Sequence, residues 1–273
     1  MSLIHTVAPG ILAADTITKL PPDAAGQVVV SGSHGGRYPG YLAAKAGLRA
    51  VILNDAGIGR DEAGIAALPY LEALGIAGTV VSHESCRIGD TQDMLARGRI
   101  SRANKVASAG GVLPGMACLE AAVLLTSAPQ VRAPDAPEVG EGRSELAAAS
   151  PRRIVLIDSA AMVRPEDAGC IVVTGSHGGL VGGDPAMALR TEGFAAVFND
   201  AGMGIDEAGV GRLAALDRRG MAAFTVSASS ARIGEARSSF EDGEISRVNE
   251  TAARLGATPG RRAREILLRW AEG

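Results

Sequence analysis

The sequence predicts an α/β protein made of an internally duplicated, Rossmann-like unit, with mostly parallel sheets, helices on both faces and two lobes related by a pseudo-twofold axis. Two observations predict this class. Nearly the same phrase occurs twice, as VVVSGSHGG at 28–36 and IVVTGSHGG at 171–179, and short apolar runs alternate with helix-like segments along the chain. Such alternation is typical of parallel sheets covered by helices.

Self-comparison extends the repeat over most of the chain. NDAGIGRDEAGI (54–65) matches NDAGMGIDEAGV (199–210), SCRIGD (85–90) matches SARIGE (230–235), and ISRANKVA (100–107) matches ISRVNETA (245–252). We therefore expect a first α/β repeat over 1–126 and a second over 152–273. The segment 127–151 is rich in Pro, Ser, Glu and Gly, which is typical of a linker.

The strands are expected where apolar, β-branched runs end in Gly, Asp, Asn or Ser. Each copy has four such runs: 11–15, 27–32, 50–55 and 78–82 in the first, and 154–158, 170–175, 195–200 and 223–227 in the second. Because the runs are continuously apolar rather than alternating, both faces of each strand should be buried, as in a parallel sheet.

Helices are expected between the strands. The segments 61–75 and 206–220 open with Asp and Glu, which favour a helix N-terminus, and close at Gly75 and Gly220. We read ISRAN (100–104) and ISRVN (245–249) as structural segments that cap and begin a helix.

Composition excludes several classes of protein. The chain has 273 residues, is 47% hydrophobic and only 3% aromatic, and carries a formal net charge of −3. No basic run interleaves with aromatic residues, so we expect no nucleic-acid partner. No stretch reaches about 18 apolar residues and no basic leader precedes an apolar run, so we expect no membrane partner and a cytoplasmic location. Small Ala- and Gly-rich helices would permit a homo-oligomer.

Metal and redox chemistry have little support in the sequence. The three cysteines lack CxxC spacing, which favours reduced thiols over a zinc site or a disulfide framework. No HxH, HxxxH or HxxE spacing appears, and GSHGG lacks the Lys of a phosphate-binding loop and the order of a dinucleotide turn. No cofactor is indicated, although a divalent metal is not excluded.

The candidate site lies at the carboxyl ends of the strands, where ligands bind in sheets of this kind. His34 and His177 occupy the same repeat position and are candidate acids or bases. With a serine beside each histidine and an Asp from the next strand, each lobe holds the ingredients of Ser/His/Asp catalysis. The candidate catalytic residues are Ser33, His34, Asp55, His83, His177 and Asp200.

Other polar residues at the same edge are candidates for substrate binding. Glycine pairs in GSHGG could present backbone N–H groups to an anion, and two arginines could clamp a carboxylate. The alternative for the arginines is a salt bridge to Asp90 or Glu235, and serines or aspartates at strand ends often cap helices instead. The candidate binding residues are Gly35, Gly36, Asn54, Glu84, Ser85, Arg87, Ser176, Asn199 and Arg232.

The two copies differ in reactive residues. Copy one has Arg37, Tyr38, His83, Glu84 and Cys86 where copy two has Leu180, Val181, Ala228, Ser229 and Ala231. This difference predicts one productive site near the first GSHGG. Cys86 is either a thiolate nucleophile beside a histidine or a small half-buried residue.

Two local resemblances concern the same motif. An apolar strand ending in Ser33-His34-Gly35, followed by one ending in Asp55-Ala56, resembles the caspase-type cysteine peptidases, but Gly57 or Gly202 stands where that family has its cysteine. The resemblance implies similar sheet topology at best, and we do not carry peptidase activity over to this chain. The HGG of GSHGG is similar to the oxyanion loop of α/β-hydrolase esterases, whose GxSxG elbow is absent.

These features favour a small-molecule enzyme, and within that class a hydrolase of a carboxylate- or amide-bearing metabolite. Two alternatives stay open. One is an isomerase, racemase or lyase in which the two lobes share a site and present His34 and His177 to opposite faces of one substrate. The other is a non-catalytic protein whose lobes close on a small anion.

Overall fold

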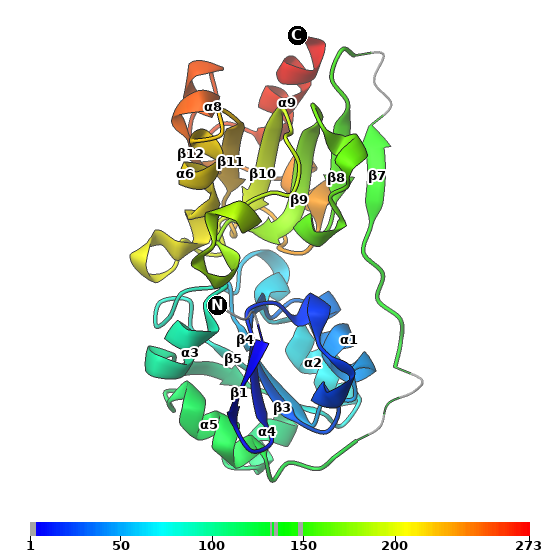
Figure 1. Cartoon of the computed structure of the whole chain (residues 1–273), viewed down its shortest axis with the longest axis vertical. Coiled ribbons are helices and arrows are strands. Elements are labelled where there is room, and N and C mark those ends of the chain that lie inside the picture. Colours follow the sequence, from blue (N-terminus) through cyan, green and yellow to red (C-terminus); the bar gives the residue numbers. More distant parts are fainter. Residues whose placement is uncertain (1–3, 132, 134–135, 147–149) are drawn as a thin grey trace.

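The structure is a computed structural model that describes residues 4–131, 133, 136–146 and 150–273. Two lobes are stacked along the long axis of the molecule, and an extended segment runs beside them to connect the two (Figure 1). This segment contains most of the expected linker 127–151, of which residues 132, 134–135 and 147–149 lie outside the described residues.

Each lobe contains one six-stranded sheet, and the two sheets have the same design. The strand orders are β1-β2-β3-β4-β5-β6 and β7-β8-β9-β10-β11-β12 across each sheet. In each, the four central strands are parallel and the two edge strands are antiparallel to their neighbours. The strands are β1 (Ile4–Ala8), β2 (Ile11–Ala14), β3 (Val28–His34), β4 (Ala50–Asn54), β5 (Ala77–Val81), β6 (Ile100–Ala103), β7 (Arg143–Leu146), β8 (Ile154–Ile157), β9 (Ile171–His177), β10 (Ala195–Asn199), β11 (Ala222–Val226) and β12 (Ile245–Val248).

Helices fill the connections between strands. The α-helices are α1 (Arg37–Lys45), α2 (Ala67–Ala73), α3 (Thr91–Arg97), α4 (Lys105–Ala109), α5 (Cys118–Leu125), α6 (Arg212–Asp217), α7 (Ala236–Glu241), α8 (Glu250–Arg254) and α9 (Ala263–Glu272). Short 3-10 helices are η1 (Ile17–Lys19), η2 (Pro22–Ala24), η3 (Arg60–Ile65), η4 (Ala160–Met162), η5 (Pro165–Asp167), η6 (Val181–Gly183), η7 (Pro185–Met187) and η8 (Ile205–Val210).

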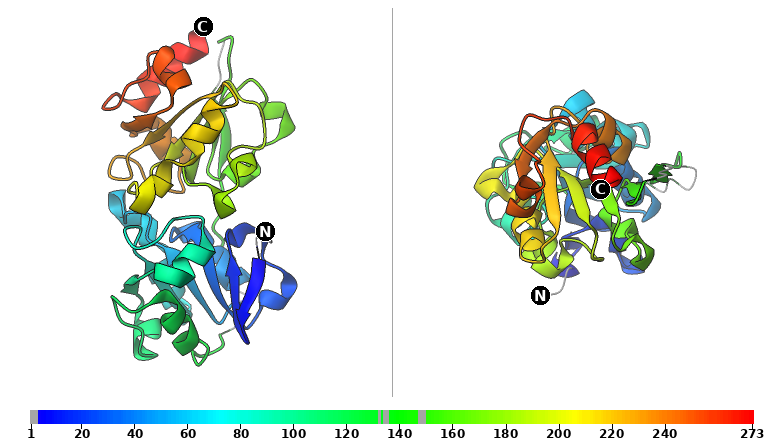
Figure 2. Two further views of the ribbon diagram at one scale, coloured as in Figure 1. Left: turned by 60° about the vertical axis from the view of Figure 1, so that its left-hand side comes forward. Right: turned by 90° about the horizontal axis from the view of Figure 1, so that it is seen from above.

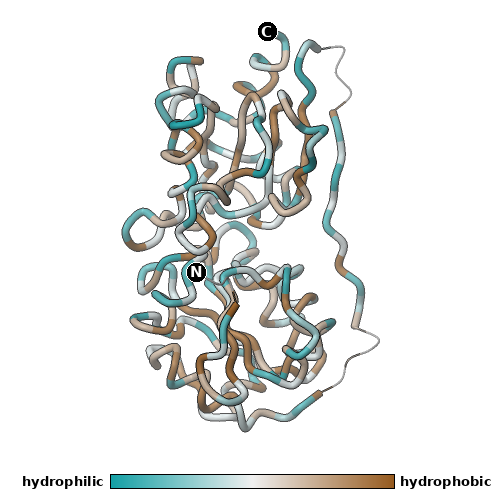
Figure 3. Tube along the Cα trace, in the orientation of Figure 1, coloured by the Kyte–Doolittle hydropathy of each residue, from teal (hydrophilic) through white to brown (hydrophobic). Residues whose placement is uncertain are grey.

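Both faces of each sheet are covered, which explains the continuously apolar strands. In β3, Val28 and Val30 pack with α3 and α5, whereas Val29 between them packs with α1 and α2. The second lobe repeats this arrangement with α7, α8 and α9 on one face and α6 on the other (Figure 2). The hydrophobic residues accordingly gather along the strands of both lobes (Figure 3).

The α/β class and the mostly parallel sheets are therefore confirmed, and the eight expected runs are the eight parallel strands. The antiparallel edge strands were not predicted, and β6 and β12 contain the Ser101 and Ser246 that we assigned to helix starts. The strand order also differs from a Rossmann sheet, which reverses direction at a switch point. Here each strand is added beside the previous one from edge to edge. Among the described residues, no helix has the length and apolar character needed to cross a bilayer.

The lobes meet through their two NDAG loops, and the contacts occur in equivalent pairs. The Arg60 N–H donates to the Ala228 carbonyl at 2.7 Å, and the Ile205 N–H donates to the His83 carbonyl at 2.9 Å. Arg232 pairs with Asp61 at 2.9 Å, and Arg87 pairs with Asp206 at 2.8 Å. A small apolar cluster of Ala56, Ile88, Ala201 and Ile233 lies between them.

The helix starts expected at Asp61-Glu62 and Asp206-Glu207 are wrong. These four residues have φ between +51° and +57°, so they form left-handed turns rather than the first turn of a helix. The side chains of Asp61 and Asp206 instead form salt bridges with arginines of the opposite lobe.

Candidate functional site

The carboxyl ends of β3 and β9 face one cavity of about 400 Å³ between the lobes. His34 and Ser33 line it from the first lobe, and His177 and Ser176 line it from the second. The two histidines predicted from the repeat therefore share a single cavity rather than occupying two sites.

An irregularity in β3 brings His34 to this position. Val30 pairs with Ile52 and His34 pairs with Asn54, so β3 uses more residues than β4 over the same length. A bulge of this kind turns a side chain and ends regular pairing. Gly32 is required there, because a Cβ would lie 2.7 Å from the carbonyl oxygen of Asp15. The valine run thus stops at a bulge that presents His34 to the cavity.

The His34 ring is fixed through one nitrogen. Its Nδ1 accepts a hydrogen bond from the Gly36 N–H at 3.1 Å, and this contact favours the tautomer with hydrogen on Nε2. Burial lowers the pKa of His34 from 6.5 to about 4, so the ring is neutral at pH 7. The ring reaches the opposite lobe, since a Cβ built on Gly234 would lie 3.5 Å from its Cε1.

His177 is the equivalent residue of the second lobe and is more deeply buried. It is 7% exposed, and its Nδ1 has no hydrogen-bond partner among the described residues. Burial lowers the pKa of His177 well below 6.5, and the positive charges of Arg212 and of protonated His34 lower it further. The Nδ1 of His177 faces the backbone of Gly179, which partly offsets the fall in the pKa of His177, as Gly36 faces His34 in the first lobe.

Arg212, at the start of α6, is the residue that the sequence analysis missed. It is 4% exposed and lines the cavity. Its guanidinium donates to the Gly179 carbonyl at 3.0 Å and to the Met187 and Ala188 carbonyls. No carboxylate of the described residues forms an ion pair with it. Burial lowers the pKa of Arg212 to about 10, so it remains a cation at pH 7.

A buried cation without a counter-ion favours binding of an anion. The repeat comparison held a signal for it, because Arg212 corresponds to Ala67 in the first copy. That difference was not among those we singled out.

The serines of the motif in both lobes, and its glycines in the first lobe, have structural partners. The Ser33 hydroxyl accepts from the Ile17 N–H at 3.1 Å, and Ser176 accepts from the Ala160 N–H at 2.9 Å. Neither is hydrogen-bonded to a histidine ring. The Gly35 N–H donates to the Asn54 carbonyl at 2.7 Å, and the Gly36 N–H is used by His34. The expected backbone cradle at Gly35 and Gly36 therefore has no free N–H group.

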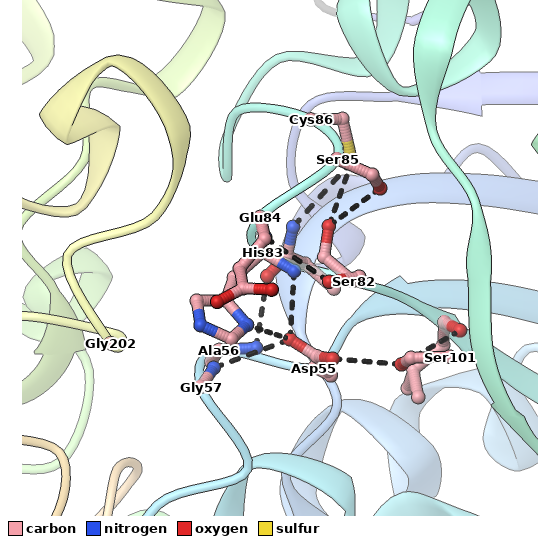
Figure 4. Close-up of polar contacts among 12 residues, drawn as sticks. Asp55, Ala56, Gly57, Ser82, His83, Glu84, Ser85, Cys86, Ser101 and Gly202 are labelled. Atoms are coloured by element: carbon pink, nitrogen blue, oxygen red, sulfur yellow. Dashed lines mark hydrogen bonds and ion pairs between the residues drawn. The ribbon is translucent and has the colours of Figure 1, made fainter.

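Asp55 binds His83 rather than His34 (Figure 4). The Asp55 carboxylate accepts from His83 Nδ1 at 2.8 Å, from the His83 N–H at 2.9 Å and from the Ser101 hydroxyl at 2.7 Å. Burial alone would raise the pKa of Asp55, but the hydrogen bonds from His83 and Ser101 outweigh it and lower the pKa. The same hydrogen bond raises the pKa of His83 against its burial. Asp55 and His83 do not line the cavity.

The remaining candidates hold loops or join the lobes. The side-chain oxygens of Asn54 and Asn199 each accept a backbone N–H in their own loop at 2.9 Å. Asp200 accepts the Gly202 and Ala228 N–H groups at 3.0 and 2.8 Å.

The turn after β5 contains Glu84 and Ser85. The Glu84 N–H donates to the Ser82 hydroxyl at 3.2 Å, and the Ser85 hydroxyl donates to the Ser82 carbonyl at 2.8 Å. Cys86 is buried, and burial raises its pKa to about 12, which disfavours a thiolate.

The candidate arginines Arg87 and Arg232 both form salt bridges. Arg87 pairs with Asp206 of the other lobe and with Asp90, and Arg232 pairs with Asp61 of the other lobe and with Glu235. Arg232 lines the cavity in this paired state, whereas Arg87 does not line it. Neither side chain is a free cation for a substrate carboxylate.

Two carboxylates on one side of the cavity were also not predicted. Asp158, at the end of β8, accepts the Ala236 and Gly142 N–H groups at 2.8 and 2.6 Å. Glu141, from the connecting segment, is hydrogen-bonded to Ser159 and Tyr38, and burial raises its pKa. Across the described parts of the chain, no group of three or more His, Cys, Asp or Glu side chains is arranged to hold a metal ion.

Comparison with models of protein families, with curated proteins and with solved structures found no match.

Proposed function

We propose that the protein is an isomerase, most specifically a racemase or epimerase, that moves a proton at the carbon next to a carboxylate. The observation that carries the proposal is the shared cavity. Two imidazoles from equivalent positions of the two lobes line it, and both are neutral at pH 7 before a substrate binds. A pair of bases on opposite sides of one carbon is what inversion of configuration requires.

Arg212 binds the substrate carboxylate and stabilises the negative charge that develops when the neighbouring carbon loses its proton. One imidazole removes that proton at Nε2 and becomes an imidazolium; for His34 this requires the ring hydrogen to move from Nε2 to Nδ1 and the contact with the Gly36 N–H to open. The substrate carboxylate favours uptake of one proton by the pair, so the other imidazole enters the cycle as an imidazolium and gives that proton to the opposite face of the carbon. The product is the mirror-image centre, and the proton has passed from one histidine to the other.

Hydrolysis by a Ser/His/Asp relay has less support. Such a relay needs a serine hydroxyl bonded to a histidine whose second nitrogen bonds an aspartate. Ser33 is bonded to the Ile17 backbone and Asp55 to His83, so neither contact reaches His34. A non-catalytic anion-binding protein remains the second candidate, because buried Arg212 would serve binding equally well.

The two lobes have equivalent sheets and equivalent contacts, which support their origin from one duplicated α/β unit. Duplication would give a pseudo-twofold axis through the cavity, and thus two equivalent bases facing one substrate. The three cysteines are free and buried, and this supports a reducing compartment such as the cytoplasm.

Hydrogen exchange in D₂O tests the proposal. Wild-type protein should introduce deuterium at the carbon next to the carboxylate of a turned-over acid, detected by mass spectrometry or proton NMR. In His34→Gln and His177→Gln, inversion should fall by about 100-fold or more. Each variant should still exchange the proton of one enantiomer, and the two variants should differ in which enantiomer that is.

His5→Gln, in β1 and outside the cavity, is the matched control and should behave as wild type. Binding of a carboxylate without any exchange would support the non-catalytic alternative and exclude the isomerase. Loss of both exchange reactions in each single variant would contradict two separate bases.

A further inference from the structure

We infer that the ligand of this cavity carries an ammonium group as well as a carboxylate, so that the substrate class is an amino acid or a close relative. The inference rests on the proposed function for its catalytic part, but the recognition it describes is separate from the chemistry. It begins from the distribution of charge along the second sheet.

The strand order places opposite charges on opposite sides of His177. Strand β9, which ends at His177, lies between β8 and β10. Asp158 follows β8, whereas Arg212 begins α6, which comes after β10 and η8, and its guanidinium contacts the Gly179 carbonyl. Neighbouring strands are about 4.8 Å apart, so β8 and β10 are separated by about 10 Å. Side chains reaching inward from the two strands can bind the two ends of one small zwitterion below His177.

The carboxylates on the β8 side have no cationic partner. Glu141 and Asp158 are close enough that Asp158 raises the pKa of Glu141. Neither forms an ion pair with a Lys, Arg or His of the described residues. Two adjacent carboxylates at a cavity wall repel each other, and an ammonium group between them would remove that repulsion.

The other charged residues of the cavity do not change this pattern. Arg232 is already paired with Asp61 and Glu235. Lys19, Arg37 and Arg190 line the cavity from exposed positions, at its rim.

An independent observation places an anion on the opposite side. Arg212 is 4% exposed, its guanidinium donates only to the Gly179, Met187 and Ala188 carbonyls, and no carboxylate of the described residues forms an ion pair with it. The buried guanidinium of Arg212 therefore favours a negative group beside it, and the half-buried carboxylates of Glu141 and Asp158 favour a positive group. A cavity of about 400 Å³ also leaves room for a side chain beyond the amino acid core.

Glu141 further explains why the connecting segment approaches the cavity. It bonds Tyr38 of the first lobe and Ser159 of the second. An ammonium group bound to Glu141 would thus be held by the segment that joins the lobes, and not by a repeated position. This accounts for how a nearly symmetric cavity orients an unsymmetric substrate.

Calorimetric titration of the full chain tests the inference. The probes are the proteinogenic amino acids in both hands, each hit being compared with its N-acetyl derivative, its desamino acid and its primary amide. We expect the amino acid to bind at least tenfold more tightly than any of the three derivatives. Glu141→Gln should reduce that preference over the desamino acid about tenfold, whereas Arg212→Gln should weaken binding of both.

Glu145→Gln is the matched control, because Glu145 is on β7, pairs with Arg153 and does not line the cavity. It should leave all affinities unchanged. The inference is overturned if no amino acid binds at 10 mM, or if desamino acids bind as tightly as amino acids.

The two proposals fail in different ways. Amino acids that bind with the expected preference but show no exchange in D₂O would refute the isomerase and leave the zwitterion site intact. Exchange of desamino acids in D₂O, with no preference for binding amino acids, would refute the zwitterion site and leave the isomerase intact.

Discussion

The histidines of this chain show how surroundings decide the charge of one side-chain type. His34 is half-buried and His177 is buried beside Arg212, and desolvation lowers the pKa of both. His83 is bonded to the carboxylate of Asp55, and its pKa rises. At pH 7 His34 and His177 are neutral. The hydrogen bond to Asp55 favours the protonated form of His83, and this contact holds the loop in which His83 lies.

The opposite shifts predict a specific dependence of stability on pH. The unfolded chain takes up a proton at His34 near pH 6.5, but the folded protein does so only near pH 4. The unfolded state thus binds more protons in this range, and the free energy of unfolding falls as the pH drops from 6.5 to 4. His34 alone should contribute a loss of up to about 2 kcal/mol at pH 5. His177 acts in the same direction, and His83 opposes both.

Urea unfolding at pH 7.5 and pH 5 measures this effect. The double variant His34→Gln/His177→Gln should lose less stability between the two pH values than wild type does. His83→Gln should lose more, because it removes the group that is stabilised by protonation. Identical losses in wild type and the double variant would contradict the buried, neutral state of the two rings.

The sequence identified some site residues and not others for clear reasons. His34 and His177 stood out because a scarce residue recurred at one repeat position. Arg212 arises in only one copy, so a search for shared residues passes over it. The partner of Asp55 depends on strand pairing: Asn54 lies beside Val81, which brings the residues after β4 and β5 together. The spacing and composition of the sequence do not predict which residues of β4 and β5 pair with each other.

At the level of elements, the NDAG loops are the most unusual backbone of the molecule. Ala56, Ile58, Ala201 and Met203 all have φ between +48° and +65°, which side-chain-bearing residues rarely adopt. Each loop is held by its own aspartate and asparagine and by the loop of the other lobe. The strain is maintained because the two loops approach each other at Gly57 and Gly202, where no side chain would fit.

Replacing Gly57 by alanine should separate the two lobes locally, at the contact between the NDAG loops. In Gly57→Ala the new Cβ would lie 2.7 Å from Gly202 Cα, and its φ of +75° adds strain. Gly220→Ala is the matched control, because Gly220 has φ of +69° and open space around it. The control should lose about 1 kcal/mol from backbone strain alone, and Gly57→Ala at least about 2 kcal/mol more. Thermal unfolding measures both, and equal losses would show that the loops do not touch.

The elements also show what an apolar pattern can and cannot predict. The parallel strands were found because both of their faces are buried, which leaves a continuous apolar run. The edge strands are only half-buried: β1 and β6 mix apolar and polar residues and resemble loops or helix starts in sequence. The sequential strand order was missed because apolar runs reveal the strands but not which of them are neighbours.

For the whole molecule, the cavity exists because the lobes dock with their strand ends facing each other. The docking contacts among the described residues are small: two equivalent backbone hydrogen bonds, a further one from the Gly182 N–H to the Gly89 carbonyl, the apolar cluster around Ala56 and Ala201, and charged pairs at the periphery. The repeat predicted two similar lobes, but nothing in the sequence stated which edges meet. A homo-oligomer remains a prediction of the composition.

The charged pairs predict that docking depends on salt. Asp61→Arg should place two cations together at Arg232 and reduce the free energy of unfolding by about 1 kcal/mol. Adding Arg232→Asp should recover part of that loss, although Arg232 also pairs with Glu235. Because these side chains are 62% and 33% exposed, 1 M NaCl should remove most of the difference between the variants. Urea unfolding at low and high salt gives the double-mutant cycle, and X-ray scattering would detect any opening of the lobes. A coupling energy of zero at low salt would mean that the apolar cluster and the backbone hydrogen bonds alone hold the two strand edges face to face.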